Sequence, residues 1–245
     1  MILLVNDDGL AAAGLRALHA ALREAGIGPV LAVAPQHERS GQSHAITLDR
    51  PLRVDARHDG DRFGFTIDGT PTDCVKVALD ALCPRPPALV ISGINDGPNV
   101  GRSLFYSGTV AAAMEAAVMG LSALAVSRAR GDRPFADAAA ATLPWVRRLL
   151  RTPHSGRVLN LNLPALPAAE WREWRVAAHG HAGFRETYRP ARDTQGRPGW
   201  LIHGEWHAAA DDDDAALLGR GHPVATLLRP DLNADQADLD GWLPP

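Results

Sequence analysis

Two adjacent carboxylates near the start of the chain are the residues best suited to chemistry. Asp7 and Asp8 directly follow the strand-like run Ile2–Asn6, and Gly9 comes next. Two carboxylates about 5 Å apart repel by roughly 3 kcal/mol at an effective dielectric constant near 20. Near a buried sheet end such a pair needs a proton or a cation, and a metal ion is the leading interpretation. The alternative is a helix cap followed by a turn.

Two later segments carry oxygen-bearing side chains that could complete a cation site. Ser40, within Arg39–Gly41, offers a hydroxyl, and Asn95, within Gly93–Gly101, offers an amide carbonyl. A ligand set made only of oxygen atoms suits magnesium, manganese or calcium better than zinc or copper. Each residue also has a plainer interpretation, because serine is common in turns and asparagine beside glycine is common at left-handed turn positions.

A helix start in the middle of the chain predicts a place for an anion. Ser107, Gly108 and Thr109 precede or open a helix expected over Thr109–Met119. Free backbone N–H groups and the positive end of the helix dipole make such a start a phosphate site, to which Asn99 could add donors. The segment is neither a Walker loop nor a dinucleotide-binding fingerprint. The alternative is a serine or threonine that only caps the helix.

Alternating strand and helix patterns position these loops. Strands are expected over Ile2–Asn6, Pro29–Ala34, Ala45–Val54, Phe63–Ile67, Ala88–Ser92, Ala123–Ser127 and Arg157–Leu161, with helices over Gly14–Ala25, Thr72–Leu82, Thr109–Met119 and Phe135–Leu150. This order predicts an α/β fold with a mostly parallel sheet and helices on both faces. Because ligands bind at the carboxyl ends of strands in open α/β sheets, the three loops should converge on one edge.

The pattern changes after Pro164. Strand-like stretches over residues 171–206, with a turn at Thr194–Arg197, predict an extended β-hairpin arm in the C-terminal third. Such arms often pair with another subunit, so we expect an oligomer. We expect residues 1–164 to form the α/β catalytic core. Residues 165–245 would supply the arm and the C-terminal segment that complete the same domain and contribute to oligomerisation.

Four consecutive acidic residues, Asp211–Asp214, precede a short helix expected over Ala215–Gly219, and a last strand is expected over His222–Leu228. We expect the carboxylates to favour the positive end of that helix and to face water. A second metal site is the alternative interpretation.

Composition excludes several classes of partner. The chain has 245 residues and a net charge of −3, without a basic stripe, so we expect no nucleic-acid polymer as partner. No run approaches the ~18 consecutive apolar residues of a membrane span, so we expect no membrane contact. A signal-peptide pattern does not precede the first strand, which favours a cytoplasmic location.

Several segments together resemble the SurE family (survival protein E) of metal-dependent nucleoside monophosphate phosphatases. They occur in the family order through the first half of the chain, and none is decisive alone. The matching segments are Ile2–Gly9, Ala34-Pro35, Arg39–Gly41, Gly69–Cys74, Ser92–Asn95 with Gly97 and Asn99, and Tyr106–Glu115.

The resemblance implies a Rossmann-like fold and a 5'-nucleotidase that often also accepts 3'-nucleotides. It implies a divalent cation, magnesium or manganese, one per subunit, with a nucleoside monophosphate as substrate. It also implies arms and C-terminal segments exchanged in homodimers or homotetramers. Carried over by motif, the metal ligands would be Asp7, Asp8, Ser40 and Asn95, and the residues around the substrate phosphate would be Asn99, Ser107, Gly108 and Thr109.

The expected reaction is metal-assisted hydrolysis of a phosphate monoester, with Asp7 or Asp8 orienting the water or acting as base. Two other functions stay open. One is a serine hydrolase using Ser107 with a histidine, of which His44 is nearest a site loop, although the Gly-x-Ser-x-Gly elbow is missing. The other is a nucleotide-binding module without turnover.

Overall fold

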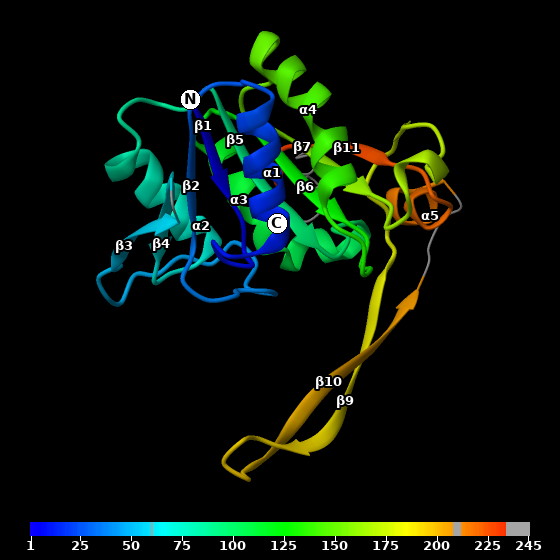
Figure 1. The fold of residues 1–245 in the computed structure, drawn as a ribbon. Helices are drawn as coiled ribbons and strands as arrows, with labels where there is room; N and C mark the ends of the chain where they lie inside the picture. The colour runs from blue at the N-terminus through cyan, green and yellow to red at the C-terminus, as the bar shows by residue number, and fades with distance from the viewer. Residues whose placement is uncertain (60, 208–211, 234–245) are drawn as a thin grey trace, which may run out of the picture.

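The computed structural model describes residues 1–59, 61–207 and 212–233, and a long twisted sheet forms its centre (Figure 1). The strands of this sheet are β1 (Ile2–Val5), β2 (Val30–Pro35), β3 (Val54–Asp59), β4 (Asp61–Ile67), β5 (Leu89–Asp96), β6 (Ser122–Arg128), β7 (Arg157–Leu163), β8 (Arg175–Val176) and β11 (Val224–Leu228). Their order is β3-β4-β2-β1-β5-β6-β7-β11-β8. From β4 to β7 neighbouring strands run parallel, whereas β3 and β11 are antiparallel to β4 and β7.

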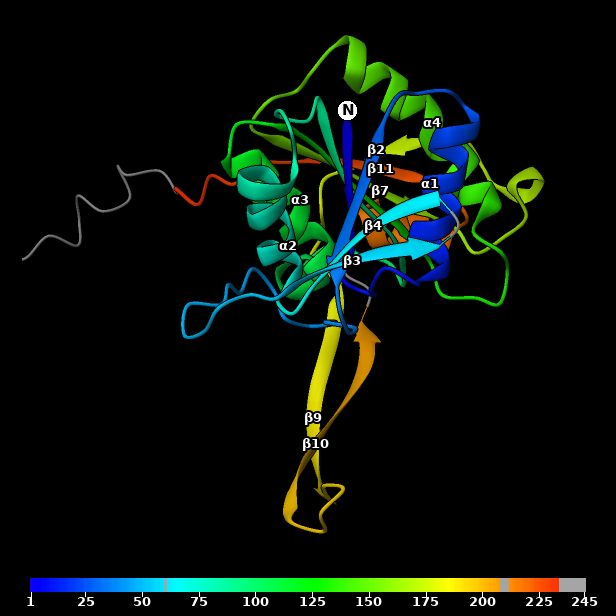
Figure 2. The same cartoon turned by 60° about the vertical axis from the view of Figure 1, so that its left-hand side comes forward.

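Helices cover both faces of the sheet, as Figure 2 shows. The helical segments are α1 (Ala13–Glu24), α2 (Pro71–Val77), η1 (Ala78–Leu82, a π-helical turn), η2 (Gly101–Tyr106), α3 (Gly108–Val118), α4 (Ala136–Arg151), η3 (Ala168–Glu170) and α5 (Asp214–Gly219). None in the described part of the chain has the length and apolar character needed to cross a bilayer.

The first strand shows how its sequence builds two cores. Successive side chains of a strand point to opposite faces of the sheet. Ile2 and Leu4 accordingly pack with α1 and α4, and Leu3 and Val5 pack with α2 and α3. All four side chains are buried, so a continuous apolar run is what this central strand requires. The predicted α/β architecture with helices on both faces is confirmed.

The predicted arm is a separate antiparallel ribbon of β9 (Gly183–Arg192) and β10 (Pro198–His207). It projects away from the sheet in both views (Figures 1 and 2). Nearly every residue along it is exposed. The expected turn is present, because the Asp193 N–H donates to the Arg197 carbonyl at 3.0 Å. The arm begins later than expected, since Arg175 and Val176 pair with β11 in the main sheet.

The strand expected over Ala45–Val54 is wrong, because the observed strand β3 only begins at Val54. The preceding residues are bound by side chains at the start of α2. Thr47 donates its hydroxyl and its N–H to the Asp73 carboxylate at 2.7 and 3.0 Å, and the Thr70 hydroxyl donates to the Ala45 carbonyl at 2.7 Å. These bonds replace the partners that a sheet neighbour would supply. The hairpin itself is present as β3 and β4.

The acidic run before α5 lies at the helix start as expected, but its last two members do not face water. Asp213 caps the helix by accepting a first-turn N–H at 2.8 Å. Asp214 is fully buried and accepts the backbone N–H groups of Gly101 and Gly180, at 3.0 and 2.9 Å. Backbone N–H groups, rather than water, therefore bind these two carboxylates. Asp211 lies outside the described residues.

Candidate active site

The loops after β1 and β2 meet the end of β5 and the first turn of α3 at one edge of the sheet. The Arg39 N–H donates to the Asp7 carbonyl at 2.8 Å, which joins the second loop to the first. The Thr109 hydroxyl donates to the Asp7 carboxylate. The backbone N–H of Asp96, at the end of β5, forms a hydrogen bond to Asp8. The expected convergence around the two aspartates is therefore present.

A tight turn fixes the two aspartates after β1. The Asn6 side chain donates to the Gly9 carbonyl at 3.0 Å and accepts the Gly9 N–H at 3.2 Å. Gly9 has a φ of +97°, a left-handed conformation that favours glycine. Asp7 is 4% exposed, whereas Asp8 is only partly buried. One carboxylate is thus enclosed by protein and the other can be reached from solvent.

Burial and neighbouring negative charges disfavour the ionised forms of Asp7 and Asp8. Burial raises the pKa of Asp7, and the hydrogen bond from Thr109 opposes that rise without cancelling it. Burial, followed by the negative charges of Asp7 and Glu38, raises the pKa of Asp8 to about 7. Near neutral pH the surrounding protein therefore disfavours two negative charges here, which leaves a deficit of positive charge at the pair. A bound cation would relieve this deficit, so the residues present fit a metal ion.

The start of α3 approaches Asp7 closely because residue 108 is glycine. A Cβ at Gly108 would lie 2.8 Å from the Asp7 Cβ and 3.1 Å from the Pro71 Cγ, closer than carbon atoms pack. Ser107 caps the helix by accepting the Val110 N–H at 3.0 Å. The Val110 N–H is thus taken by Ser107, and the Thr109 N–H bonds to the Asp7 carboxylate. Among the described residues this leaves the N–H of Gly108, together with the positive end of the helix dipole, for an anion.

Two further predicted metal ligands carry oxygen atoms at the same edge. The exposed Ser40 donates its hydroxyl to the Glu38 carboxylate at 2.8 Å. Asn95 is partly buried at the end of β5, where its side-chain nitrogen donates to the Gly97 carbonyl at 2.8 Å. That bond fixes the amide nitrogen and leaves the amide oxygen for a ligand. Metal binding by both residues stays a prediction.

His, Cys, Asp and Glu side chains alone would not complete a metal site at this edge of the sheet. Across the residues that the structure describes, no group of three or more His, Cys, Asp or Glu side chains is arranged to hold a metal ion. A cation at Asp7 and Asp8 would therefore draw on hydroxyl and amide oxygens, the donors that Ser40 and Asn95 offer. Such a set is typical of magnesium and manganese sites.

The structure adds residues that the sequence analysis missed. The negative charge of Glu38 contributes to the raised pKa values of both aspartates. The signal for it in the sequence was an acidic residue close to Ser40. Asn99, predicted to contact phosphate, is buried and is bound by Asn160 and Asn162 of β7. Two asparagines within an otherwise apolar strand were the signal for that contact.

The arrangement does not support a serine hydrolase. His44 Nε2 lies 2.8 Å from a carboxylate oxygen of Glu115, and Lys76 Nζ lies 2.8 Å from the other oxygen. Among the described residues no hydrogen bond joins His44 to Ser107. The Ser107 hydroxyl caps α3, and a nucleophilic serine needs a base within hydrogen-bond reach.

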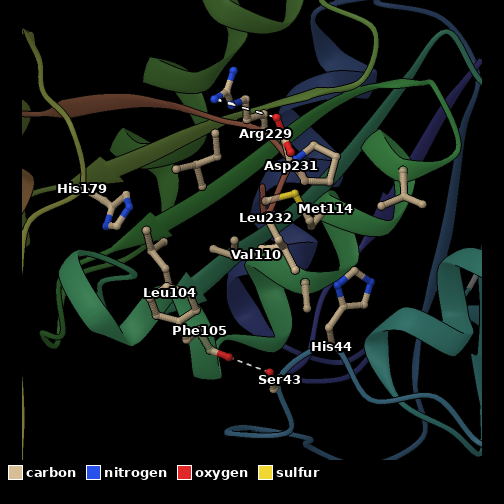
Figure 3. A pocket seen from close by; sticks show the side chains of 14 residues that line it. Ser43, His44, Leu104, Phe105, Val110, Met114, His179, Arg229, Asp231 and Leu232 are labelled. Carbon is tan, nitrogen blue, oxygen red and sulfur yellow. Dashed lines mark hydrogen bonds and ion pairs between the residues drawn. The ribbon is translucent and has the colours of Figure 1, made fainter. Parts of the chain in front are cut away.

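An apolar cavity of about 530 Å³ adjoins the first turn of α3 (Figure 3). Val110 and Met114 of α3 line it, together with Phe105, His44 and Leu232. The Ser43 hydroxyl donates to the Phe105 carbonyl at 2.6 Å, which ties the loop that carries Ser40 to this wall. The cavity is thus a neighbour of the polar cluster and not its centre.

Comparison with known proteins places this geometry in a family. A model of the family described as Survival protein SurE matches residues 2–186. The 5'/3'-nucleotidase SurE of Edwardsiella ictaluri (strain 93-146) is 44% identical over 247 residues, covering 99% of this chain and 95% of the relative. The protein of the same name from Yersinia enterocolitica (serotype O:8 / biotype 1B, strain NCTC 13174 / 8081) is 42% identical, with 99% and 97% covered. The crystal structure of the SurE protein from Aquifex aeolicus superposes with a TM-score of 0.82 at 33% identity, over 99% of this chain and 97% of that one. The chain therefore belongs to the SurE family.

Proposed function

We propose that this protein is a divalent-metal-dependent 5'/3'-nucleotidase that hydrolyses nucleoside monophosphates to a nucleoside and inorganic phosphate. The observation that carries the proposal is the junction of Asp7 with the first turn of α3. It sets an anionic pair suited to a cation beside the positive end of the α3 dipole, which suits a phosphate. The names of the relatives, 5'/3'-nucleotidase SurE, support the same reaction.

We assign the cation, magnesium or manganese with one ion per subunit, to Asp7, Asp8, Ser40 and Asn95. The raised pKa values of the two aspartates support this assignment, because a cation would favour the ionised carboxylates that burial and neighbouring negative charges disfavour. When bound, a divalent cation neutralises phosphoryl oxygens and lowers the pKa of water.

The chain's own residues would then orient the reactants. We assign orientation or deprotonation of the attacking water to Asp8, because it is the more accessible carboxylate, while Thr109 fixes Asp7. Water attacks phosphorus, the bond from phosphorus to the nucleoside oxygen breaks, and the proton that the water loses ends on the leaving oxygen. The side chain of Asn99 and the helix start at Ser107–Thr109 would stabilise the charge on the phosphoryl oxygens.

Phosphate release from a panel of 5'- and 3'-nucleoside monophosphates tests the activity. We expect release with magnesium or manganese, its loss after chelation and its recovery when metal is returned. Saturable nucleotide binding without phosphate release, with every metal and at every pH tried, would instead support a binding module.

We also propose that the chain forms a homodimer or homotetramer through its arm. A lone two-stranded ribbon is marginally stable in water. This one exposes Tyr188, Trp200 and Ile202, with Tyr188 opposite Ile202. Light scattering should give the mass of two or four chains. The double variant Trp200→Ser, Ile202→Ser should dissociate, and a monomeric wild type would contradict the proposal.

Two further expectations remain proposals. We propose that residues 165–245 complete the same domain, which the pairing of β11 with β7 supports. We also propose a cytoplasmic location, which fractionation of cells that express the protein would test.

A further inference from the structure

Strand β7 carries two asparagines where an apolar side chain would suit the core. Asn160 and Asn162 are both fully buried, among the equally buried Val158, Leu161 and Leu163 of the same strand. Burying an amide is costly unless hydrogen bonds replace the lost water. The partners of these two side chains therefore indicate what the strand needs them for.

Both side chains bind the backbone of a single residue, Asn99. The side-chain oxygen of Asn162 accepts the Asn99 N–H at 2.8 Å, and its nitrogen donates to the Asn99 carbonyl at 2.9 Å. The Asn160 nitrogen donates to the same carbonyl at 2.9 Å. Asn99 in turn donates its side-chain N–H to the Ser127 hydroxyl at 2.8 Å, at the end of β6. Strands β6 and β7 thus fix the backbone and one side-chain donor of Asn99.

The contact has a cost that core packing does not explain. The side-chain oxygen of Asn160 is buried and has no hydrogen-bond partner among the described residues. An apolar residue at this position would avoid that penalty. In place of an apolar contact, Asn160 makes a hydrogen bond to the loop that carries Asn99. Gly97 and Gly101 flank Asn99 in this loop, and both have left-handed backbone conformations.

We infer that Asn160 and Asn162 are positioning residues for the substrate phosphate and act through Asn99. The inference rests on the proposed function, in which Asn99 contacts the phosphate. With one amide hydrogen of Asn99 held by Ser127, the other has no acceptor among the described residues, and we assign it to a phosphoryl oxygen. Small errors in such positions have large effects on binding and rate, so a loop residue with this role needs rigid support.

Thr226 of β11 provides a matched control. It lies directly opposite Asn160 in the sheet, and its hydroxyl is also buried without a partner among the described residues. Thr226→Val therefore changes a buried polar atom in the same layer without altering the Asn99 contacts.

The test measures inorganic phosphate and Mn²⁺ affinity by titration, with KM, kcat and melting temperature, in wild type, Asn160→Leu, Asn162→Leu and Thr226→Val. We expect both asparagine variants to bind phosphate at least about tenfold more weakly, the equivalent of one hydrogen bond. KM should rise while Mn²⁺ affinity stays as in wild type, and Thr226→Val should change none of these. Because Asn160→Leu also removes the unpartnered oxygen, it should fold even if Asn162→Leu does not.

Wild-type phosphate affinity in a folded Asn160→Leu protein would overturn the inference. Parallel loss of phosphate and Mn²⁺ affinity would also overturn it, since that pattern indicates general loosening of the sheet edge. A wild-type protein that releases no phosphate from any nucleoside monophosphate would refute the proposed function instead, so the two failures are distinguishable.

Discussion

The hydroxyl of Thr109 donates a hydrogen bond to the carboxylate of Asp7 and so joins the first turn of α3 to the end of β1. Both residues are buried, and 102 residues of sequence separate them. This bond therefore joins the predicted phosphate site at the start of α3 to the predicted metal site at the end of β1.

Removing this hydroxyl should impair catalysis more than folding. Thr109→Val keeps the shape of the side chain but removes the hydroxyl that donates to the Asp7 carboxylate, which then keeps only backbone donors. Because a hydrogen bond to a charged group contributes about 1.5–3 kcal/mol, we expect kcat to fall by roughly 10- to 100-fold. Thr142→Val is the control, since the buried Thr142 hydroxyl donates to the Ala138 carbonyl within α4. Equal kcat values for the two variants would contradict a role for Thr109 at the site.

Gly108 should not tolerate even one methyl group. In Gly108→Ala the new Cβ would meet Asp7 and Pro71, so α3 must move away from the aspartate pair. We expect kcat/KM to fall at least about tenfold, because a shift of roughly 1 Å has effects of that size or larger. Gly219→Ala at the end of α5 is the control, because none of the described residues lies within 4 Å of the added carbon. Kinetics of Gly108→Ala that match this control would show that the close approach is not needed.

The metal-free protein should lose stability as the pH rises toward neutrality. The pKa of Asp8 is about 7 in the folded protein, against an ordinary value of 3.8, and that of Asp7 is also raised. The folded state therefore binds more protons than the unfolded chain between these values, and its extra stability is lost as the pH rises through about 7. After discounting for the partial exposure of Asp8, we expect the free energy of unfolding to fall by roughly 1–2 kcal/mol.

Thermal denaturation with a chelator between pH 5 and pH 8 checks this expectation. Each kcal/mol corresponds to about 2–4 °C for a chain of this size. Added Mg²⁺ should restore the melting temperature at pH 8, and Asp8→Asn should flatten the metal-free profile. A melting temperature that rises with pH in the metal-free wild type would contradict the electrostatic description of the pair.

Glu115 should stabilise the fold through its charge. Burial alone would raise its pKa, but the hydrogen bonds from Lys76 and His44 outweigh burial and hold the pKa below its ordinary 4.5. Its contribution is therefore present above pH 4.5 and is lost as the pH falls through the lower folded value. We expect Glu115→Gln to cost about 1–2 kcal/mol at pH 7 and less at pH 3.5, as measured by urea denaturation. An equal cost at both values would indicate a packing effect.

The sequence predicted the parts of this molecule that local pattern controls. The run Ile2–Val5 had to be a buried strand, and polar residues that follow successive parallel strands had to meet at one edge. Two contacts confirm this expectation: Asp7 with Thr109, and Arg39 with the Asp7 carbonyl.

Contacts between distant side chains were not predictable in the same way. Asp73 and Thr70 bind the segment before β3, so its strand-like composition was misleading. Asn160 and Asn162 lie more than 60 residues from their partner Asn99, and no local periodicity indicates such a pairing. Only the folded chain shows which distant backbone groups need these donors and acceptors.

The most direct test of the central claim is phosphate release from nucleoside monophosphates by three preparations: metal-loaded wild type, chelator-stripped wild type and Asp8→Asn supplied with metal. We predict turnover in the first, its loss in the second with recovery when Mg²⁺ or Mn²⁺ returns, and a loss of at least about 100-fold in the third. Equal turnover by the stripped and loaded enzymes, or full turnover by Asp8→Asn, would contradict a metal-assisted reaction at Asp7 and Asp8.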